Sequence, residues 1–187
     1  MKRIVIFASG SGTNAENIIR YFKNHKSARV TLVLSNKENA GVFERCKNQQ
    51  ISYLYFKKSD FTNSETILNL LKKEADFIVL AGFLLKVPEN IIEAFPNKII
   101  NIHPALLPKY GGKGMYGMRV HEAVIEAREQ KSGITIHWVN KFYDEGQIIF
   151  QESFIIDTNE TPESLARRIH ELEYRNFPVV IERLLSE

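Results

Sequence analysis

Short, almost wholly apolar segments separated by helical patterns are the feature that most constrains the fold of this chain. Such segments occur at residues 4–8, 30–34, 77–81 and 99–102. Strands without alternation between apolar and polar residues are typical of a parallel sheet that helices cover on both faces. With right-handed connections through helices, the pattern predicts an α/β fold with an open, doubly wound, mostly parallel sheet.

The segments between these strands carry helical signals. Helical patterns are present at residues 14–22 and 41–48, and a weak strand is expected at 51–56. Ser64 fits the N-cap of the next helix, and Pro88 fits the first turn of another. Strand and helix therefore alternate through the first half of the chain, as βαβ units require.

The last third has a different pattern. A helix is expected at 121–127, and strands are expected at 133–139 and 148–156. A short polar segment joins these strands, so they are predicted to pair as an antiparallel hairpin at the edge of the sheet. Thr161-Pro162-Glu163 begins a long C-terminal helix. With no repeat or linker in view, residues 1–187 are predicted to form a single domain.

Composition excludes several classes of protein. The chain is 44% hydrophobic and 25% charged, an ordinary globular composition that argues against disorder. A net charge of +3 is too small to indicate nucleic-acid binding without a clustered basic stripe. One cysteine, Cys46, suits a reducing compartment, and the apolar run at 4–8 is too short for a leader or membrane span. We expect a cytoplasmic protein that binds neither nucleic acid nor a membrane.

The glycine-rich segment at residues 9–14 is the first candidate site. It follows a strand and precedes a helix, where backbone N–H groups and the helix dipole favour an anion. Gly10 to Ala15 also fits the G-x-G-x-x-A pattern of dinucleotide sites. The corner Ser35-Asn36-Lys37 lacks the acid that would bind a ribose, which disfavours NAD, although Lys37 could meet an NADP phosphate. The alternative is a tight turn that binds nothing.

The end of the strand at 99–102 is the second candidate. Asn101 and His103 alternate with Ile102, so both side chains leave the strand end on one face. An amide and an imidazole together can stabilise an oxyanion and move a proton. The loop that follows contains two prolines and four glycines, which fits a segment that approaches a ligand. The alternative is that His103 is structural and the glycines only turn the chain.

Asp144, between the last two strands, is the third candidate. A carboxylate near His103 would orient the imidazole and favour its protonated form, but alone Asp144 is an ordinary acidic turn residue. His137 alternates in a strand and is interpreted as structural. The other histidines, His25, His121 and His170, lie in polar or helical segments and form no pair with the spacing of metal ligands, so no metal is expected.

Four motifs together resemble a known enzyme family. The glycine-rich loop at 9–14, "AGFLLKVP" at 81–88, "NIHPALLPKY" at 101–110 and "DEGQII" at 144–149 follow the order and spacing of glycinamide ribonucleotide formyltransferases. These are folate-dependent enzymes of purine biosynthesis with a Rossmann-like formyltransferase fold. Methionyl-tRNA formyltransferase and formyl-folate hydrolase resemble the same domain but add another one, for which we find no counterpart here, so both are disfavoured.

The resemblance implies roles for individual residues. The catalytic residues are Asn101, His103 and Asp144. The phosphoribosyl substrate is contacted by a second group, Gly12, Thr13, Asn14, Ala15, Glu16 and Glu173. The folate co-substrate, 10-formyltetrahydrofolate, is held by Leu84, Leu85, Lys86 and Val87 together with Asn101. The family often has an arginine at the position of Ser64 and a longer polar side chain at that of His170.

The implied reaction transfers a formyl group from the folate to the amine of glycinamide ribonucleotide. Asn101 and protonated His103 would stabilise the tetrahedral oxyanion, and Asp144 would raise the pKa of His103 enough to supply imidazolium near neutral pH. Neither a metal nor a covalent intermediate is required, and we expect a monomer or weak homodimer. Two alternatives remain: a formyl-folate hydrolase of the same fold, and a non-catalytic nucleotide-binding domain that uses only the loop at 10–15.

Overall fold

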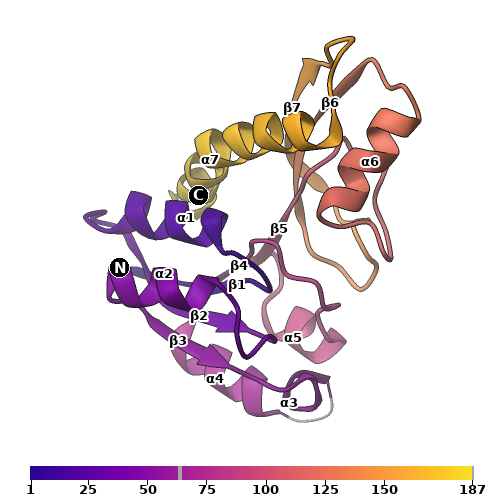
Figure 1. Cartoon of the computed structure of the whole chain (residues 1–187). Coiled ribbons are helices and arrows are strands. Elements are labelled where there is room, and N and C mark those ends of the chain that lie inside the picture. The colour runs from indigo at the N-terminus through magenta and orange to yellow at the C-terminus, as the bar shows by residue number, and fades with distance from the viewer. Residues whose placement is uncertain (63–64, 187) are drawn as a thin grey trace.

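The computed structural model describes residues 1–62 and 65–186, and Figure 1 shows its elements. In this part of the chain seven strands form one sheet in the order β3-β2-β1-β4-β5-β6-β7. They are β1 (Lys2–Phe7), β2 (Ala28–Ser35), β3 (Ser52–Tyr55), β4 (Phe77–Leu80), β5 (Ile99–His103), β6 (Lys131–Trp138) and β7 (Ile148–Ile155). The first five strands are parallel, whereas β6 and β7 are each antiparallel to the preceding neighbour.

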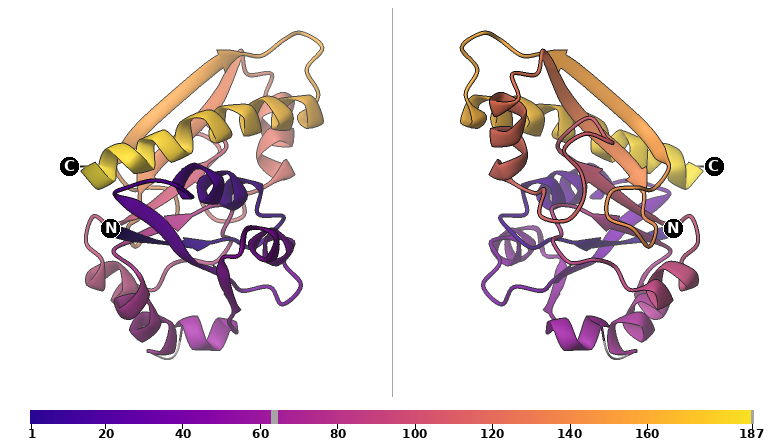
Figure 2. Two further views of the ribbon diagram at one scale, coloured as in Figure 1. Left: turned by 90° about the vertical axis from the view of Figure 1, so that its left-hand side faces the viewer. Right: turned by 90° about the vertical axis from the view of Figure 1, so that its right-hand side faces the viewer.

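Both faces of the sheet are buried, because successive residues of the central strand point to opposite sides. Ile4 and Ile6 of β1 belong to one apolar cluster, and Val5 and Phe7 belong to the other. The first cluster is covered by α1 (Thr13–Phe22), α2 (Val42–Gln49), α6 (Met118–Glu126) and α7 (Pro162–Ser186). The second is covered by α3 (Lys58–Thr62), α4 (Thr66–Glu74) and α5 (Glu89–Ala94), as the two views in Figure 2 show.

The predicted fold class is confirmed, with an open, mostly parallel sheet, an antiparallel edge and a long C-terminal helix. The short helix α3 was not predicted, because its five residues are too few to show a helical period. The weak strand at 51–56 is the outermost strand, β3, and all four of its residues are exposed. Ser64, the predicted cap, lies outside the described residues.

The topology brings distant segments to one edge of the sheet. The neighbouring parallel strands β1, β4 and β5 end side by side, so the loops after Phe7, Leu80 and His103 meet there. The connection from β6 to β7 also reaches this edge, because Asp144 on it accepts the N–H of Gly112 from the loop after β5 at 2.9 Å. Helix α7 crosses behind α1, where Asn17 Nδ2 donates to the Tyr174 carbonyl at 2.8 Å (Figure 1). No helix in the described ranges is long and apolar enough to cross a membrane.

Candidate active site

The loop after β1 presents backbone N–H groups at the start of α1. Gly12 precedes the helix with a φ of 74°, and no side chain caps the first turn. The N–H groups of that turn have no partner within the helix, as at every helix start. The loop is tightly packed, because a Cβ at Gly12 would lie 2.3 Å from a side-chain carbon of Val42 on α2. This glycine therefore serves close approach as well as the left-handed turn.

Two arginines meet at the outer side of this loop. Arg45 of α2 donates from Nε to the Ser11 carbonyl at 2.7 Å and from Nη1 to Glu16. The other carboxylate oxygen of Glu16 pairs with Arg20 at 2.6 Å. The Glu16 side chain, a predicted substrate contact, is thus occupied by two guanidinium groups and holds Arg45 beside the loop. Arg45 carried no signal in the sequence analysis.

Asn14 and Glu173 join the loop to the C-terminal helix. Both are buried, and Asn14 Nδ2 donates to Glu173 Oε2 at 2.8 Å. His170 Nδ1 lies 2.9 Å from the same oxygen, and this hydrogen bond raises the pKa of His170. Asn14 Oδ1 has no hydrogen-bond partner among the described residues. Two predicted substrate contacts 159 positions apart in sequence therefore lie in direct contact.

Ser9 connects the glycine-rich loop to the segment after β4. Its hydroxyl donates to Asn36 Oδ1 at 2.6 Å and accepts the Leu84 N–H at 3.0 Å, and its own N–H donates to the Gly82 carbonyl at 3.0 Å. The corner Ser35-Asn36-Lys37, which lacks a ribose-binding acid, therefore holds Ser9 through the Asn36 side chain. Because of these bonds, the segment predicted to contact the folate lies next to the loop predicted to contact the phosphate.

His103 lies at the end of β5, and each of its two ring nitrogens faces an oxygen atom. Nε2 is 2.7 Å from the Tyr110 carbonyl oxygen, and since that oxygen can only accept, Nε2 carries the hydrogen. Nδ1 faces Asp144 Oδ2 at 3.6 Å. The loop behind the ring is anchored by buried Thr135, which donates to the Ala105 carbonyl at 2.7 Å and accepts the Leu107 N–H at 3.0 Å.

Asp144 lies among the remaining polar groups of the site. Its Oδ2 accepts the Gly112 N–H at 2.9 Å, and its Oδ1 lies 3.4 Å from Asn101 Nδ2 and 3.6 Å from His137 Nε2. Asn101 Nδ2 also lies 3.1 Å from His137 Nε2. The three residues predicted as catalytic are therefore brought together, and His137 joins them. His137 is buried and its Nδ1 lies 2.9 Å from the Trp138 carbonyl oxygen, as the interpretation of a satisfied structural histidine expects. Its contact with Asn101 could have been indicated only by their pairing across the sheet.

Burial and charge oppose each other in this cluster. Burial lowers the pKa of His103 below its usual value, although the Asp144 charge and the Tyr110 carbonyl raise it. Burial raises the pKa of Asp144, but contacts with His137, His103 and Gly112 outweigh burial and leave that pKa low. The predicted direction of the Asp144 effect is present, but the expectation of sufficient imidazolium at neutral pH is corrected, because burial is the larger influence on His103.

A small cleft opens beside this cluster. It contains four of the five predicted folate-contacting residues and two of the predicted catalytic ones, with Asn101 belonging to both sets. Its lining also includes aromatic side chains from the connection between β6 and β7, which carried no signal in the sequence analysis. The cleft is lined by Leu80, Phe83, Leu85, Lys86, Val87, Asn101, His137, Val139, Asn140, Phe142, Tyr143 and Asp144. Leu84 is absent from this lining, and its backbone N–H instead bonds to Ser9.

Comparison with known families decides what kind of site this is. The profile described as Formyl transferase matches residues 2–181 of the chain. The chain belongs to the formyl transferase family. The resemblance inferred from the four motifs is thereby confirmed over nearly the whole length.

Several relatives of this chain carry a more specific name. Phosphoribosylglycinamide formyltransferase of Bacillus subtilis is 35% identical over 192 residues, which cover 100% of this chain and 96% of the relative. The chloroplastic enzyme of the same name from Arabidopsis thaliana is 38% identical, and this chain spans only 66% of its length. The crystal structure of phosphoribosylglycinamide formyltransferase from Bacillus halodurans is 36% identical with a TM-score of 0.88, covering 100% of this chain and 96% of that one.

One further histidine of this chain is buried near the site. His121 on α6 is 3% exposed, and its Nδ1 has no hydrogen-bond partner in the described part of the chain. Burial lowers the pKa of His121 to about 4, and the nearby charges of His170, Glu173 and His103 also act on it. In sequence this residue was grouped with polar and helical histidines. Its burial comes from the packing of α6 against the sheet and α7, which sequence period alone did not reveal.

Proposed function

We propose that this chain transfers the formyl group of 10-formyltetrahydrofolate to the amine of glycinamide ribonucleotide, a step of purine biosynthesis. The observation that carries the proposal is the cluster of Asn101, His103 and Asp144 in a member of the formyl transferase family. Relatives matched over nearly their whole length bear the name of this activity. No cofactor other than the folate co-substrate is required.

The acceptor is proposed to bind along the loop before α1. N–H groups of Gly12, Thr13, Asn14 and Ala15 would hold its phosphate, helped by the positive end of the helix dipole. Glu173 would contact the ribonucleotide through the oxygen that does not bond Asn14 and His170, since both bonds use Oε2. Glu16 would act indirectly, because its carboxylate is bound to Arg45 and Arg20.

The folate is proposed to enter the cleft beside Leu85, Lys86 and Val87, with Leu84 fixed by Ser9 at its border. The cavity there measures about 50 Å³, much less than small-molecule sites usually have. We therefore infer that the connection between β6 and β7 moves when folate binds. Phe142 and Tyr143 on that connection are exposed, which leaves them free to pack on the ligand.

The chemistry follows from a His103 that is neutral before reaction. The amine attacks the formyl carbon, and Nδ1 of neutral His103, the nitrogen without a hydrogen, takes the proton that the amine loses. The imidazolium so formed lies against the Asp144 carboxylate, which stabilises it at the moment the oxyanion develops. Asn101 Nδ2 would donate to that oxyanion, a contribution of about 3 kcal/mol when well aligned. The proton then passes to the folate nitrogen as its bond to the formyl carbon breaks.

We also propose a single domain over residues 1–187 that acts as a monomer or weak homodimer. In this domain the N-terminal half holds the phosphate, and the C-terminal half holds the folate and the catalytic residues. The one cysteine, Cys46, is free and buried, which agrees with a reducing compartment, and we propose a cytoplasmic location.

A spectroscopic assay of 10-formyl folate tests the activity. We expect deformylation only when glycinamide ribonucleotide is present, together with one formylated acceptor for each folate consumed. Equal turnover without the ribonucleotide, with release of formate, would identify a hydrolase. No turnover in either case, together with saturable NADP binding, would identify the non-catalytic nucleotide-binding alternative.

A further inference from the structure

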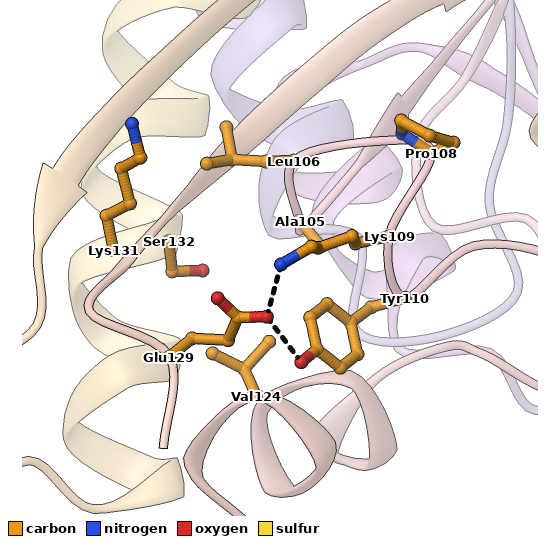
Figure 3. Close-up of a pocket in the computed structure, with 9 residues that line it drawn as sticks. All are labelled: Ala105, Leu106, Pro108, Lys109, Tyr110, Val124, Glu129, Lys131 and Ser132. Carbon is orange, nitrogen blue, oxygen red and sulfur yellow. Dashed lines mark hydrogen bonds and ion pairs between the residues drawn. The ribbon is translucent and has the colours of Figure 1, made fainter. Parts of the chain in front are cut away.

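A second cavity, of about 260 Å³, lies behind the loop that follows β5. It is enclosed by that loop, by α6 and the turn after it, and by the first residues of β6 (Figure 3). Its lining residues are Ala105, Leu106, Pro108, Lys109, Tyr110, Val124, Glu129, Lys131 and Ser132. The cleft beside Asn101 and Asp144 shares none of these residues, so the two cavities are separate.

An unpaired hydroxyl faces this cavity. Ser132 is 2% exposed, and its Oγ has no hydrogen-bond partner among the described residues. Figure 3 shows the hydroxyl directed into the space between Leu106, Lys109 and Glu129. A buried polar group without a partner is costly, and a ligand that supplies the partner removes the cost. The hydroxyl therefore indicates that the occupant carries a hydrogen-bonding group.

The charges around the cavity indicate the sign of that group. The charge of Glu129 is already paired, because its Oε1 accepts from Lys109 Nζ at 2.8 Å and from the Tyr110 hydroxyl at 2.9 Å. Lys131 is exposed and has no ion-pair partner in the described part of the chain. In Figure 3 its ammonium points away from Glu129, and its flexible stem can turn toward an anion at the mouth. Two lysines face one glutamate, so the lining has an excess of positive charge.

We propose that this cavity binds a small apolar monocarboxylate. The apolar body would pack on Ala105, Leu106, Pro108 and Val124, and the carboxylate would accept from the Ser132 hydroxyl and from Lys131. A phosphate or dicarboxylate fits less well, because one hydroxyl and one unpaired lysine cannot offset a second buried charge.

Tyr110 connects this cavity to the candidate active site. Its ring and hydroxyl line the cavity, whereas its backbone carbonyl accepts the hydrogen bond from His103 Nε2 at 2.7 Å. A ligand that shifts Tyr110 therefore changes the surroundings of His103. The regulatory consequence rests on the proposed function, but binding and its effect on the His103 ring do not.

NMR titration of the substrate-free protein with 3-phenylpropionate tests the proposal, with 3-phenylpropanol as the uncharged control. We expect saturable shifts in residues 105–110 and 124–132, a shift of the His103 ring signals, and roughly tenfold weaker binding of the alcohol. Ser132→Ala should also weaken carboxylate binding roughly tenfold. This variant should fold, because Oγ makes no hydrogen bond within the described protein.

Ser153→Ala is the matched control, since Ser153 is an exposed serine on the neighbouring strand and lies outside the cavity. Its affinity for 3-phenylpropionate should equal that of the unmodified protein. No saturable shifts, or equal binding of acid and alcohol that Ser132→Ala leaves unchanged, would overturn the site. Binding without any change at His103 would overturn the connection through Tyr110. Because no substrate is present, these results stay separate from failure of the formyl-transfer assay.

Discussion

The two ends of the candidate site present different kinds of chemical group. At the loop before α1, the proposed functional groups are backbone N–H groups, and the side chains around them are occupied in holding the loop. At the end of β5, the proposed functional groups are buried or half-buried side chains, and the backbone serves to orient them. The first end depends on conformation and close packing, whereas the second depends on protonation.

This difference predicts how each end fails. A backbone site tolerates changes of charge nearby but not an added Cβ, because the chain must keep its path. A site of buried ionisable groups tolerates a small change of volume better than a change of charge, because burial and neighbouring charges set the pKa of each group. Four measurements can break or sharpen this comparison.

Gly12→Ala should have the largest effect, which is a loss of folding stability. The added Cβ meets Val42 at 2.3 Å, and residue 12 has a φ of +74°. Strain and overpacking together should lower the free energy of unfolding by about 2–4 kcal/mol, measured by urea denaturation. Gly10→Ala is the control, because no atom lies within 4 Å of a Cβ there. Equal losses in the two variants would contradict the role of close packing at residue 12.

His121 should make the free energy of unfolding of the protein depend on pH. The folded pKa of about 4 lies below the unfolded value of 6.5, so the unfolded state binds the proton more readily between these values. Stability is therefore full above pH 6.5 and is lost as pH falls toward 4, by about 3 kcal/mol from this residue. Denaturation at pH 7 and pH 5 should show a smaller difference in His121→Phe. The same difference in both proteins would mean that other groups cause it.

Asp144→Asn should act on His103 with little effect on the fold. Asp144 has a φ of 55°, a conformation that asparagine also adopts readily, and the amide oxygen can still accept from Gly112. Without the charge, burial is opposed less, so the pKa of His103 should fall further. Turnover should drop roughly tenfold or more, because the imidazolium formed during transfer is less stable. An NMR titration of His103 that is unchanged in the variant would rule out this coupling.

The contrast between the two ends also explains what could be predicted from sequence. The glycine-rich loop was predictable, because a strand, glycines and a helix start fix where backbone N–H groups point. Asn101 and His103 were predictable as a pair, because alternation along one strand places both on one face. The short apolar segments predicted the sheet for the same local reason.

Groups that depend on distant packing were not predictable in this way. His137 approaches Asn101 only because β6 is antiparallel to β5, and Arg45 approaches Ser11 only because α2 packs against the loop. The family resemblance supplied Asp144, whereas its distance from His103 in sequence gave no physical signal. The pKa of His103 was misjudged because sequence indicates the neighbouring charge but not the degree of burial.

Arg45→Met should have the smallest effect, and it tests whether charge matters at the backbone end. Arg45 Nε bonds the Ser11 carbonyl and its guanidinium lies beside the proposed phosphate site, but its side chain is 33% exposed, so solvent screens its charge. We expect the Kd for glycinamide ribonucleotide to rise roughly three- to fivefold by calorimetry, with less change at high salt. Arg20→Met is the matched control, because Arg20 binds the same Glu16 but is 64% exposed and makes no bond to the loop. Equal weakening by both changes would show that general positive charge is sufficient. A change in Arg45→Met alone that high salt leaves intact would instead show that Arg45 acts by fixing the Ser11 backbone, which would make the loop a purely conformational site.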